Sequence, residues 1–131
     1  MAKVTGIGGV FFKSTNDHKK LAEWYSQNLG IQLEAWGGAI LKWTDDKAQD
    51  GLTVWHVAEK NTQWFSPSAS SFMINYRVDN MSEMLGDLKR NGVDILKGPE
   101  SDDNGIFAWI LDPDGNKVEL WEPRDEKNKA K

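Results

Sequence analysis

An internal repeat is the feature that most constrains how this chain of 131 residues folds. Residues 10–13 (Val-Phe-Phe-Lys) align with residues 74–77 (Ile-Asn-Tyr-Arg), and Asn16 aligns with Asn80, at a single shift of 64 residues. Both halves show the same order of predicted elements: a strand, a helix and three further strands. Such self-similarity indicates two modules related by pseudo-symmetry. We expect a single domain with modules at residues 5–58 and 72–122, a linker at 59–71 and a charged tail at 123–131.

The elements of the first module follow from hydrophobic spacing. Leu21, Trp24 and Tyr25 stand at helical spacing and predict a helix. It is expected to begin after an N-cap at Asn16 and to stop at Gly30. Apolar, β-branched and aromatic segments between turn signals predict strands at residues 6–14, 31–35, 39–43 and 52–57.

The second module repeats this order with clearer boundary signals. Asn80 with Glu83 three residues later is typical of a capping box, and Asn91-Gly92 closes the predicted helix. Its buried face is predicted to consist of Met81, Met84, Leu85 and Leu88. Strands are predicted at residues 72–78, 93–97, 105–111 and 117–121, with a turn at 112–116.

Composition excludes several classes of function. Sixteen basic and twenty acidic residues give a net charge of -4, and no basic patch lies on an aromatic-rich face, so nucleic acid is not expected as a partner. The absence of cysteine excludes disulfides, thiolate metal sites and cysteine nucleophiles. No apolar run approaches the roughly 18 residues of a membrane span. We therefore expect a cytoplasmic protein that does not bind membranes.

The two modules, Leu29-Gly30 after an aromatic helix, and the ending Asp-Pro-Asp-Gly-Asn-Lys-Val-Glu-Leu at residues 112–120 resemble the vicinal oxygen chelate superfamily. This superfamily includes glyoxalases, bleomycin-resistance proteins and extradiol dioxygenases, and the resemblance covers residues 5–122. It implies an α+β fold in which two βαβββ modules form a curved mixed sheet, or half-open barrel, with the helices on the convex side. Ligands are expected inside the cup. The resemblance to bleomycin-resistance proteins also implies a homodimer.

Enzymes of this superfamily hold a divalent metal ion through the first and fourth strands of each module. By resemblance, and with the 64-residue shift, these four positions are Gly9, Trp55, Met73 and Glu119. A catalytic metal site needs at least three suitable protein donors, and only Glu119 is one. We therefore expect neither a metal ion nor another cofactor. A one-residue bulge that turns His56 inward would favour the alternative, a divalent metal ion held by Glu119 and His56.

Seven tryptophans are more than a core of this size needs, so some are expected to line the cup. Strand alternation gives the candidate ligand-binding residues Trp55, Met73, Asn75, Arg77, Phe107, Trp109, Glu119 and Trp121. Purely structural roles remain as alternatives for these residues. In these alternatives, Arg77 and Glu119 form an ion pair and the tryptophans only fill the cavity. The linker residues Trp64 and Phe65 are expected to form a lid, a dimer contact or a hydrophobic staple.

The sequence thus predicts a protein that binds a small aromatic or cationic molecule in an aromatic cup without the usual metal tetrad. Three alternatives stay open. One is a metal-dependent glyoxalase-like lyase or isomerase, or a dioxygenase, that uses Glu119 and His56. Another is an enzyme in which Glu119 is a metal-free catalytic base beside Arg77. The last is a purely structural or interaction module.

Overall fold

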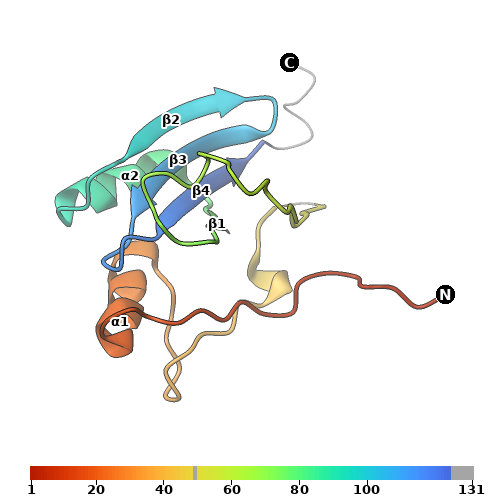
Figure 1. Cartoon of the computed structure of the whole chain (residues 1–131), viewed down its shortest axis with the longest axis horizontal. Helices are drawn as coiled ribbons and strands as arrows, with labels where there is room; N and C mark the ends of the chain where they lie inside the picture. The colour runs from red at the N-terminus through yellow and green to blue at the C-terminus, as the bar shows by residue number, and fades with distance from the viewer. Residues whose placement is uncertain (49, 125–131) are drawn as a thin grey trace.

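The computed structural model describes residues 1–48 and 50–124, and the predicted tail from residue 125 onward lies outside the described residues. The described chain contains one four-stranded curved, open sheet and two α-helices (Figure 1), which confirms the α+β class. No helix among these residues is long and apolar enough to cross a membrane. The elements are α1 (His18–Leu29), the short 3-10 helix η1 (Trp43–Asp45), β1 (Ile74–Arg77), α2 (Met81–Arg90), β2 (Lys97–Asp102), β3 (Gly105–Leu111) and β4 (Lys117–Pro123).

The sheet belongs entirely to the second predicted module. Its strands lie in the order β1-β4-β3-β2, with β1 parallel to β4 and the other two pairs antiparallel. The order β1, α2, β2, β3, β4 along the chain confirms the βαβββ prediction for this half. Within the described residues, β1 and β2 are the two edges of the sheet.

Both helices begin and end at local signals. The side chain of Asp17, and not of Asn16, caps α1 by accepting hydrogen bonds from the N–H groups of Lys19 and Lys20. Asp17 caps the helix in place of Asn16 because its negative charge also interacts favourably with the positive N-terminal end of the helix. Gly30 ends α1 in the left-handed conformation, with φ of 71°. The predicted cap of α2 is confirmed, since Asn80 Oδ1 accepts from the N–H of Glu83.

The core lies between the two helices and one face of the sheet. Leu21 and Tyr25 of α1 meet Leu88 of α2 over the buried residues of β3 and β4. Met84, predicted as buried, packs only partly against this core. The fully or largely buried members are Leu21, Tyr25, Met81, Leu85, Leu88, Ala108, Ile110, Val118 and Leu120.

The turn between β3 and β4 fastens α1 to the sheet. Tyr25 donates its hydroxyl to Asp112 Oδ2 at 2.7 Å, although the two residues are 87 positions apart. Asn116 donates its backbone and side-chain N–H groups to the same carboxylate, each at 2.9 Å. Burial, then the hydrogen bond to Asp112, raises the pKa of Tyr25, so this hydroxyl stays protonated and remains a donor.

The prediction for the second strand of this module is wrong in position. The strand was expected at residues 93–97, but β2 starts at Lys97 and runs to Asp102. Val93 and Ile95 instead pack against the core from the connection that precedes β2. A polar segment that contains Pro99 is suited to this position because β2 is an edge strand with exposed side chains.

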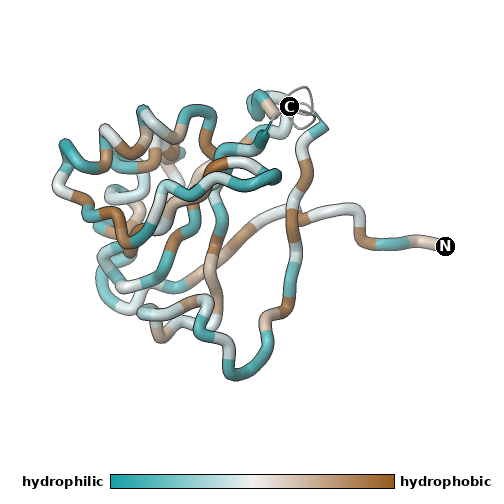
Figure 2. Tube along the Cα trace, turned by 90° about the horizontal axis from the view of Figure 1, so that it is seen from above, coloured by the Kyte–Doolittle hydropathy of each residue, from teal (hydrophilic) through white to brown (hydrophobic). Residues whose placement is uncertain are grey.

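The first predicted module forms its helix but not its strands. Residues 6–14, 31–35, 39–43 and 52–57 are extended or irregular chain, apart from the start of η1 at Trp43. Figures 1 and 2 both show the N-terminal segment leaving the body of the molecule. A strand needs ladder partners, and among the described residues these segments pair with no strand of the sheet, although Ile31 still packs against the core.

Candidate functional site

The candidate site lies on the face of the sheet opposite the helices, which we call the concave face. Alternation along β3 and β4 turns one set of side chains toward the helices and the other set away from them. Cross-strand pairing places Phe107 opposite Trp121, and Trp109 opposite Glu119. Glu119 in turn lies beside Asn75 of β1. Three strands therefore bring together predicted site residues that are far apart in the sequence.

The aromatic rings of this face lie nearly parallel. Phe107 and Trp121 have ring centroids 6.0 Å apart and planes 6° from parallel. Phe107 and Trp109 are 6.3 Å apart with an angle of 15°. The indole N–H of Trp121 donates to the backbone oxygen of Asn104 at 2.9 Å, which fixes its ring. The three rings form a row with a common orientation, which we call the aromatic row.

Glu119 is the buried acid of this face, with 8% of its surface exposed. Burial raises its pKa, while Asn75, the positive charge of Lys117 and Trp109 act in the opposite direction. Trp109 is close enough to favour the charged form of Glu119. The indole Nε1 atom of Trp109 is fully buried, but it makes no hydrogen bond to any described residue. A buried donor without a partner is rare in proteins.

Two lysines that were not among the predicted site residues approach Trp109. Lys97 Nζ lies 5.3 Å and Lys117 Nζ 5.9 Å from the centroid of the indole ring. Lys117 also donates to the backbone oxygen of Trp64 at 2.8 Å and so fastens the linker to this face. Burial, then the positive charge of Lys97, lowers the pKa of Lys117. Lys117 stands two residues before Glu119 in β4, so strand alternation already placed it on this face.

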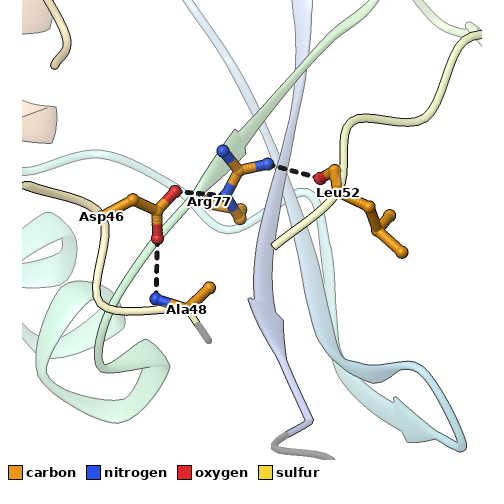
Figure 3. Close-up of polar contacts among 4 residues, drawn as sticks. All are labelled: Asp46, Ala48, Leu52 and Arg77. Carbon is orange, nitrogen blue, oxygen red and sulfur yellow. Dashed lines mark hydrogen bonds and ion pairs between the residues drawn. The ribbon is translucent and has the colours of Figure 1, made fainter. Parts of the chain in front are cut away.

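Arg77 does not pair with Glu119, and the predicted ion pair is therefore wrong. Figure 3 shows the guanidinium between two segments of the first half of the chain. Its Nε lies 2.6 Å from Asp46 Oδ2, and its Nη1 donates to the backbone oxygen of Leu52 at 2.8 Å. No local pattern predicted that Asp46 would reach Arg77 of β1, because this contact joins residues 31 positions apart.

The remaining predicted residues are not gathered around Glu119. Trp55 is 74% exposed and does not line a closed cup within one chain. His56 lies against the ring of Trp64, with centroids 5.7 Å apart. Met73 borders a surface hollow of about 800 Å³ between residues 56–60 and 62–73. A second hollow, of about 430 Å³, lies between the ends of α1 and α2, away from the concave face.

The described residues do not fit the metal site of the superfamily's enzymes. They contain no group of three His, Asp or Glu side chains arranged to hold a metal ion. Glu119 is surrounded instead by an amide, an indole and the ammonium group of Lys117. An ammonium group repels a cation, and burial alone favours the protonated carboxylic acid. We therefore derive no chemistry through a metal ion.

Solved structures share the arrangement of these elements. TnmS3, an antibiotic binding protein from Streptomyces sp. CB03234, is 25% identical, with 92% of this chain and 100% of that chain covered and a TM-score of 0.56. A glyoxalase/bleomycin resistance protein from the same organism is 23% identical, with 83% and 94% covered and a TM-score of 0.51. The chain has the vicinal oxygen chelate fold. A superfamily member from Sphaerobacter thermophilus is 21% identical, with 83% and 90% covered and a TM-score of 0.50.

No protein-family model matches the sequence, and no curated protein matches it. The fold is therefore established by structure, as the ending at residues 112–120 predicted. Glyoxalases, bleomycin-resistance proteins and dioxygenases share this fold, so the fold alone does not identify the activity of this chain. The choice rests on the side chains of the concave face.

Proposed function

We propose that this chain is a small-molecule binding protein that holds a planar aromatic ligand on the concave face without a metal ion. The observation that carries the proposal is the parallel aromatic row of Phe107, Trp109 and Trp121 beside a buried acid. Trp109 and Trp121 are each only 9% exposed and Phe107 is half-buried, so a flat ligand would add to the row at the exposed part of Phe107, at little cost in side-chain entropy.

Two polar groups are available to orient such a ligand. The indole N–H of Trp109 is a buried donor that makes no hydrogen bond to any other described residue. Glu119 has a raised pKa, and in its protonated form it also donates a hydrogen bond. Both groups suit a ligand that carries a hydrogen-bond acceptor, such as a ring carbonyl. An acceptor would satisfy the Trp109 N–H, which otherwise remains buried at a cost.

Local charge bears on the class of ligand. The net charge of -4 favours a cation, as the sequence suggested. On the concave face itself, however, Lys97 and Lys117 both approach Trp109. Lys97 is also paired with Glu100 at 3.6 Å, so Lys117 supplies most of the local positive charge, which acts at short range while the net charge acts from a distance and is screened by salt. We therefore propose a neutral or anionic aromatic ligand.

A structural relative supports the same proposal. TnmS3 is described as an antibiotic binding protein. An antibiotic with a flat ring system is thus one natural ligand to screen.

A charge series tests the proposal. Tryptophan fluorescence and calorimetric titration are measured with 2-naphthol, naphthalene-2-sulfonate and a naphthyl-trimethylammonium salt. We expect saturable binding of the first two and weaker binding of the cation. Phe107→Ala should weaken binding about tenfold, which corresponds to about 1.4 kcal/mol. Trp36→Ala, at a site 70% exposed, is the matched control and should bind normally.

Two results would contradict the proposal. Equal losses in Phe107→Ala and Trp36→Ala would mean that the aromatic row is not the binding site. Stoichiometric Ni, Zn, Fe or Mn in the purified protein, measured by elemental analysis, would contradict metal-free binding. It would favour the metalloenzyme alternative instead.

A further inference from the structure

The linker between the two predicted modules is attached to the sheet at two points, and we call residues 59–71 the strap. The ammonium group of Lys117 donates to the backbone oxygen of Trp64 at 2.8 Å. The hydroxyl of Ser70 donates to Asn116 Oδ1 at 2.5 Å. Figure 1 shows the yellow-green strap passing in front of the sheet. Both attachments therefore involve neighbouring residues at the beginning of β4.

The two attachments differ in rigidity. Asn116 is 5% exposed and also donates to the carboxylate of Asp112, so it is fixed in the turn before β4. Lys117 instead carries its ammonium group on a flexible stem. Between the attachments the strap borders the hollow of about 800 Å³ and closes its turns with backbone hydrogen bonds of its own. The attachment at Ser70 is therefore rigid, and the attachment at Trp64 moves with the stem of Lys117.

Lys117 is a buried cation without an anionic partner among the described residues. It is 9% exposed, yet none of the ion pairs of these residues includes it. Glu119 lies on the same face, but it forms no ion pair with the ammonium group either. An ammonium group carries three N–H donors, and Trp64 supplies one neutral acceptor. Because buried charges in proteins are normally paired, this group is suited to bind an anion.

Lys97, the other lysine near Trp109, is less suited to this role. Its side chain is 60% exposed, and its Nζ lies 3.6 Å from Glu100 Oε1. Lys97 therefore has an anionic partner already, and water screens its charge. The difference in burial and pairing singles out Lys117.

The ammonium group of Lys117 is within reach of a ligand at the aromatic row. Trp109 stacks against Phe107 with ring centroids 6.3 Å apart, and Lys117 Nζ lies 5.9 Å from the centroid of Trp109. One two-ring ligand can therefore contact Phe107 with its rings and Lys117 with its substituent.

We propose that Lys117 binds an anionic group of the ligand, such as a carboxylate or a sulfonate, and that the strap positions its ammonium group through the oxygen of Trp64. This inference rests on the proposed function and narrows its ligand class to aromatic acids. The remaining N–H donors of Lys117 contact the anion while one keeps its bond to Trp64. A charge-assisted bond of this kind is roughly twice as strong as a neutral hydrogen bond.

Attachment of the strap and binding of the anion are then coupled. The attached strap restricts the stem of Lys117 before the ligand arrives, which lowers the entropy cost of binding. By thermodynamic reciprocity, the bound anion stabilises the attached strap. The strap should therefore exchange its amide hydrogens more slowly when an anionic ligand is bound.

The charge preference of the site tests the role of Lys117. Calorimetric titration compares naphthalene-2-sulfonate with 2-naphthol, and circular dichroism checks that each variant folds. We expect the unmodified protein to bind the sulfonate about tenfold more tightly, and Lys117→Met to lose this preference. Lys97→Met should reduce it less. Lys89→Met, which removes the same charge from an exposed position of α2, is the matched control and should retain it.

Two results of this comparison would overturn the proposal. An unchanged preference in Lys117→Met would mean that Lys117 does not bind the anion. An equal reduction in Lys117→Met and Lys97→Met would mean that the site senses only the total charge of the face.

Hydrogen exchange followed by mass spectrometry tests the strap. Naphthalene-2-sulfonate should slow the exchange of residues 59–71 in the unmodified protein but not in Lys117→Met, and 2-naphthol should leave it unchanged. Without ligand, these residues should exchange faster in Lys117→Met than in Lys89→Met. Equal exchange in the two variants would mean that Lys117 does not hold the strap, which overturns the coupling.

Ser70→Ala loosens the strap at its other attachment and leaves the ammonium group in place. We expect the affinity for naphthalene-2-sulfonate to fall several-fold and the affinity for 2-naphthol to stay nearly normal, because only the anion depends on the position of Lys117. Equal weakening of both ligands would mean that Ser70 has a purely structural role, and it would overturn positioning by the strap.

A ligand without a ring separates this inference from the proposed function. If neither naphthalene derivative binds, the proposed function fails. Methanesulfonate, compared with sodium chloride at the same ionic strength, then decides the inference. Slower exchange of residues 59–71 in the unmodified protein but not in Lys117→Met would support the anion site, and no change in either protein would overturn it.

Discussion

At the residue scale, Asp112 shows how one side chain can unite distant parts of the fold. Its carboxylate is 5% exposed and accepts from Tyr25, Asn116 and the backbone of Asp114. The sequence placed Asp112 in a turn, which is correct. Only the fold shows that this turn also holds α1 against the sheet.

Asp112→Ala should lower the free energy of unfolding by about 3 kcal/mol, because it leaves several buried donors without an acceptor. Urea denaturation followed by circular dichroism measures this change. The exposed loop residue Asp103 is the control, and Asp103→Ala should stay within about 0.5 kcal/mol of the unmodified protein. Equal effects in the two variants would disprove the role of the turn.

Glu119 predicts a particular pH dependence at the same scale. Its pKa is raised in the folded protein from 4.5, chiefly by burial, so the folded state binds the proton more tightly than the unfolded state. Its contribution to stability is then fully present below the unfolded pKa and is lost as pH rises through the folded pKa. Glutamine does not titrate, so Glu119→Gln does not lose this stability as the pH rises.

The stability of Glu119→Gln relative to the unmodified protein should therefore increase as pH rises above 4.5. Urea unfolding at several pH values in this window measures the difference. Glu100, exposed on β2, supplies the control, and Glu100→Gln should show no comparable trend. A constant difference across the window would mean that the pKa of Glu119 is not raised.

At the scale of elements, glycine conformation determines how β2, β3 and β4 meet. Gly105 begins β3 with φ of 134°, and an added Cβ would lie 2.1 Å from the backbone oxygen of Glu122. Gly115 in the β3–β4 turn has φ of 80° but open space around it. Alanine substitutions at the two positions therefore distinguish the cost of steric overlap from the cost of backbone strain.

Gly115→Ala should cost about 1 kcal/mol, from the left-handed backbone alone. Gly105→Ala should cost roughly 3 kcal/mol or more, since overlap with the β4 backbone adds to the strain. Thermal unfolding of both variants measures the difference. Similar costs at the two positions would mean that the β3–β4 end relaxes to admit the methyl group.

At the scale of the whole molecule, the homodimer that we propose from the resemblance predicts that stability depends on concentration. Each exposed apolar side chain that becomes fully buried in a dimer contributes about 1.5–3 kcal/mol, and residues 1–64 carry several. Because association stabilises the folded state by mass action, Tm should fall on dilution. Calorimetry at concentrations a hundredfold apart would show this shift. A constant Tm would contradict the dimer.

Local sequence determined both helices, the hairpin of β3 and β4 and the fold class, but not the position of β2. The signals at Gly30, Asn80 and residues 112–116 are local, and helices and hairpins form from contacts between near neighbours in the chain. Alternation along β3 and β4 likewise placed Phe107, Trp109, Glu119 and Trp121 on one face, because the side-chain period of a strand is fixed.

Only the tertiary structure decided which partner each group finds. Arg77 binds Asp46 and not Glu119, and Lys97 reaches Trp109 from a strand that starts later than the pattern indicated. The predicted strands of the first half likewise find no partner within the described chain. Periodicity fixes the face on which a side chain lies, but pairing depends on contacts between distant residues, which no local pattern encodes.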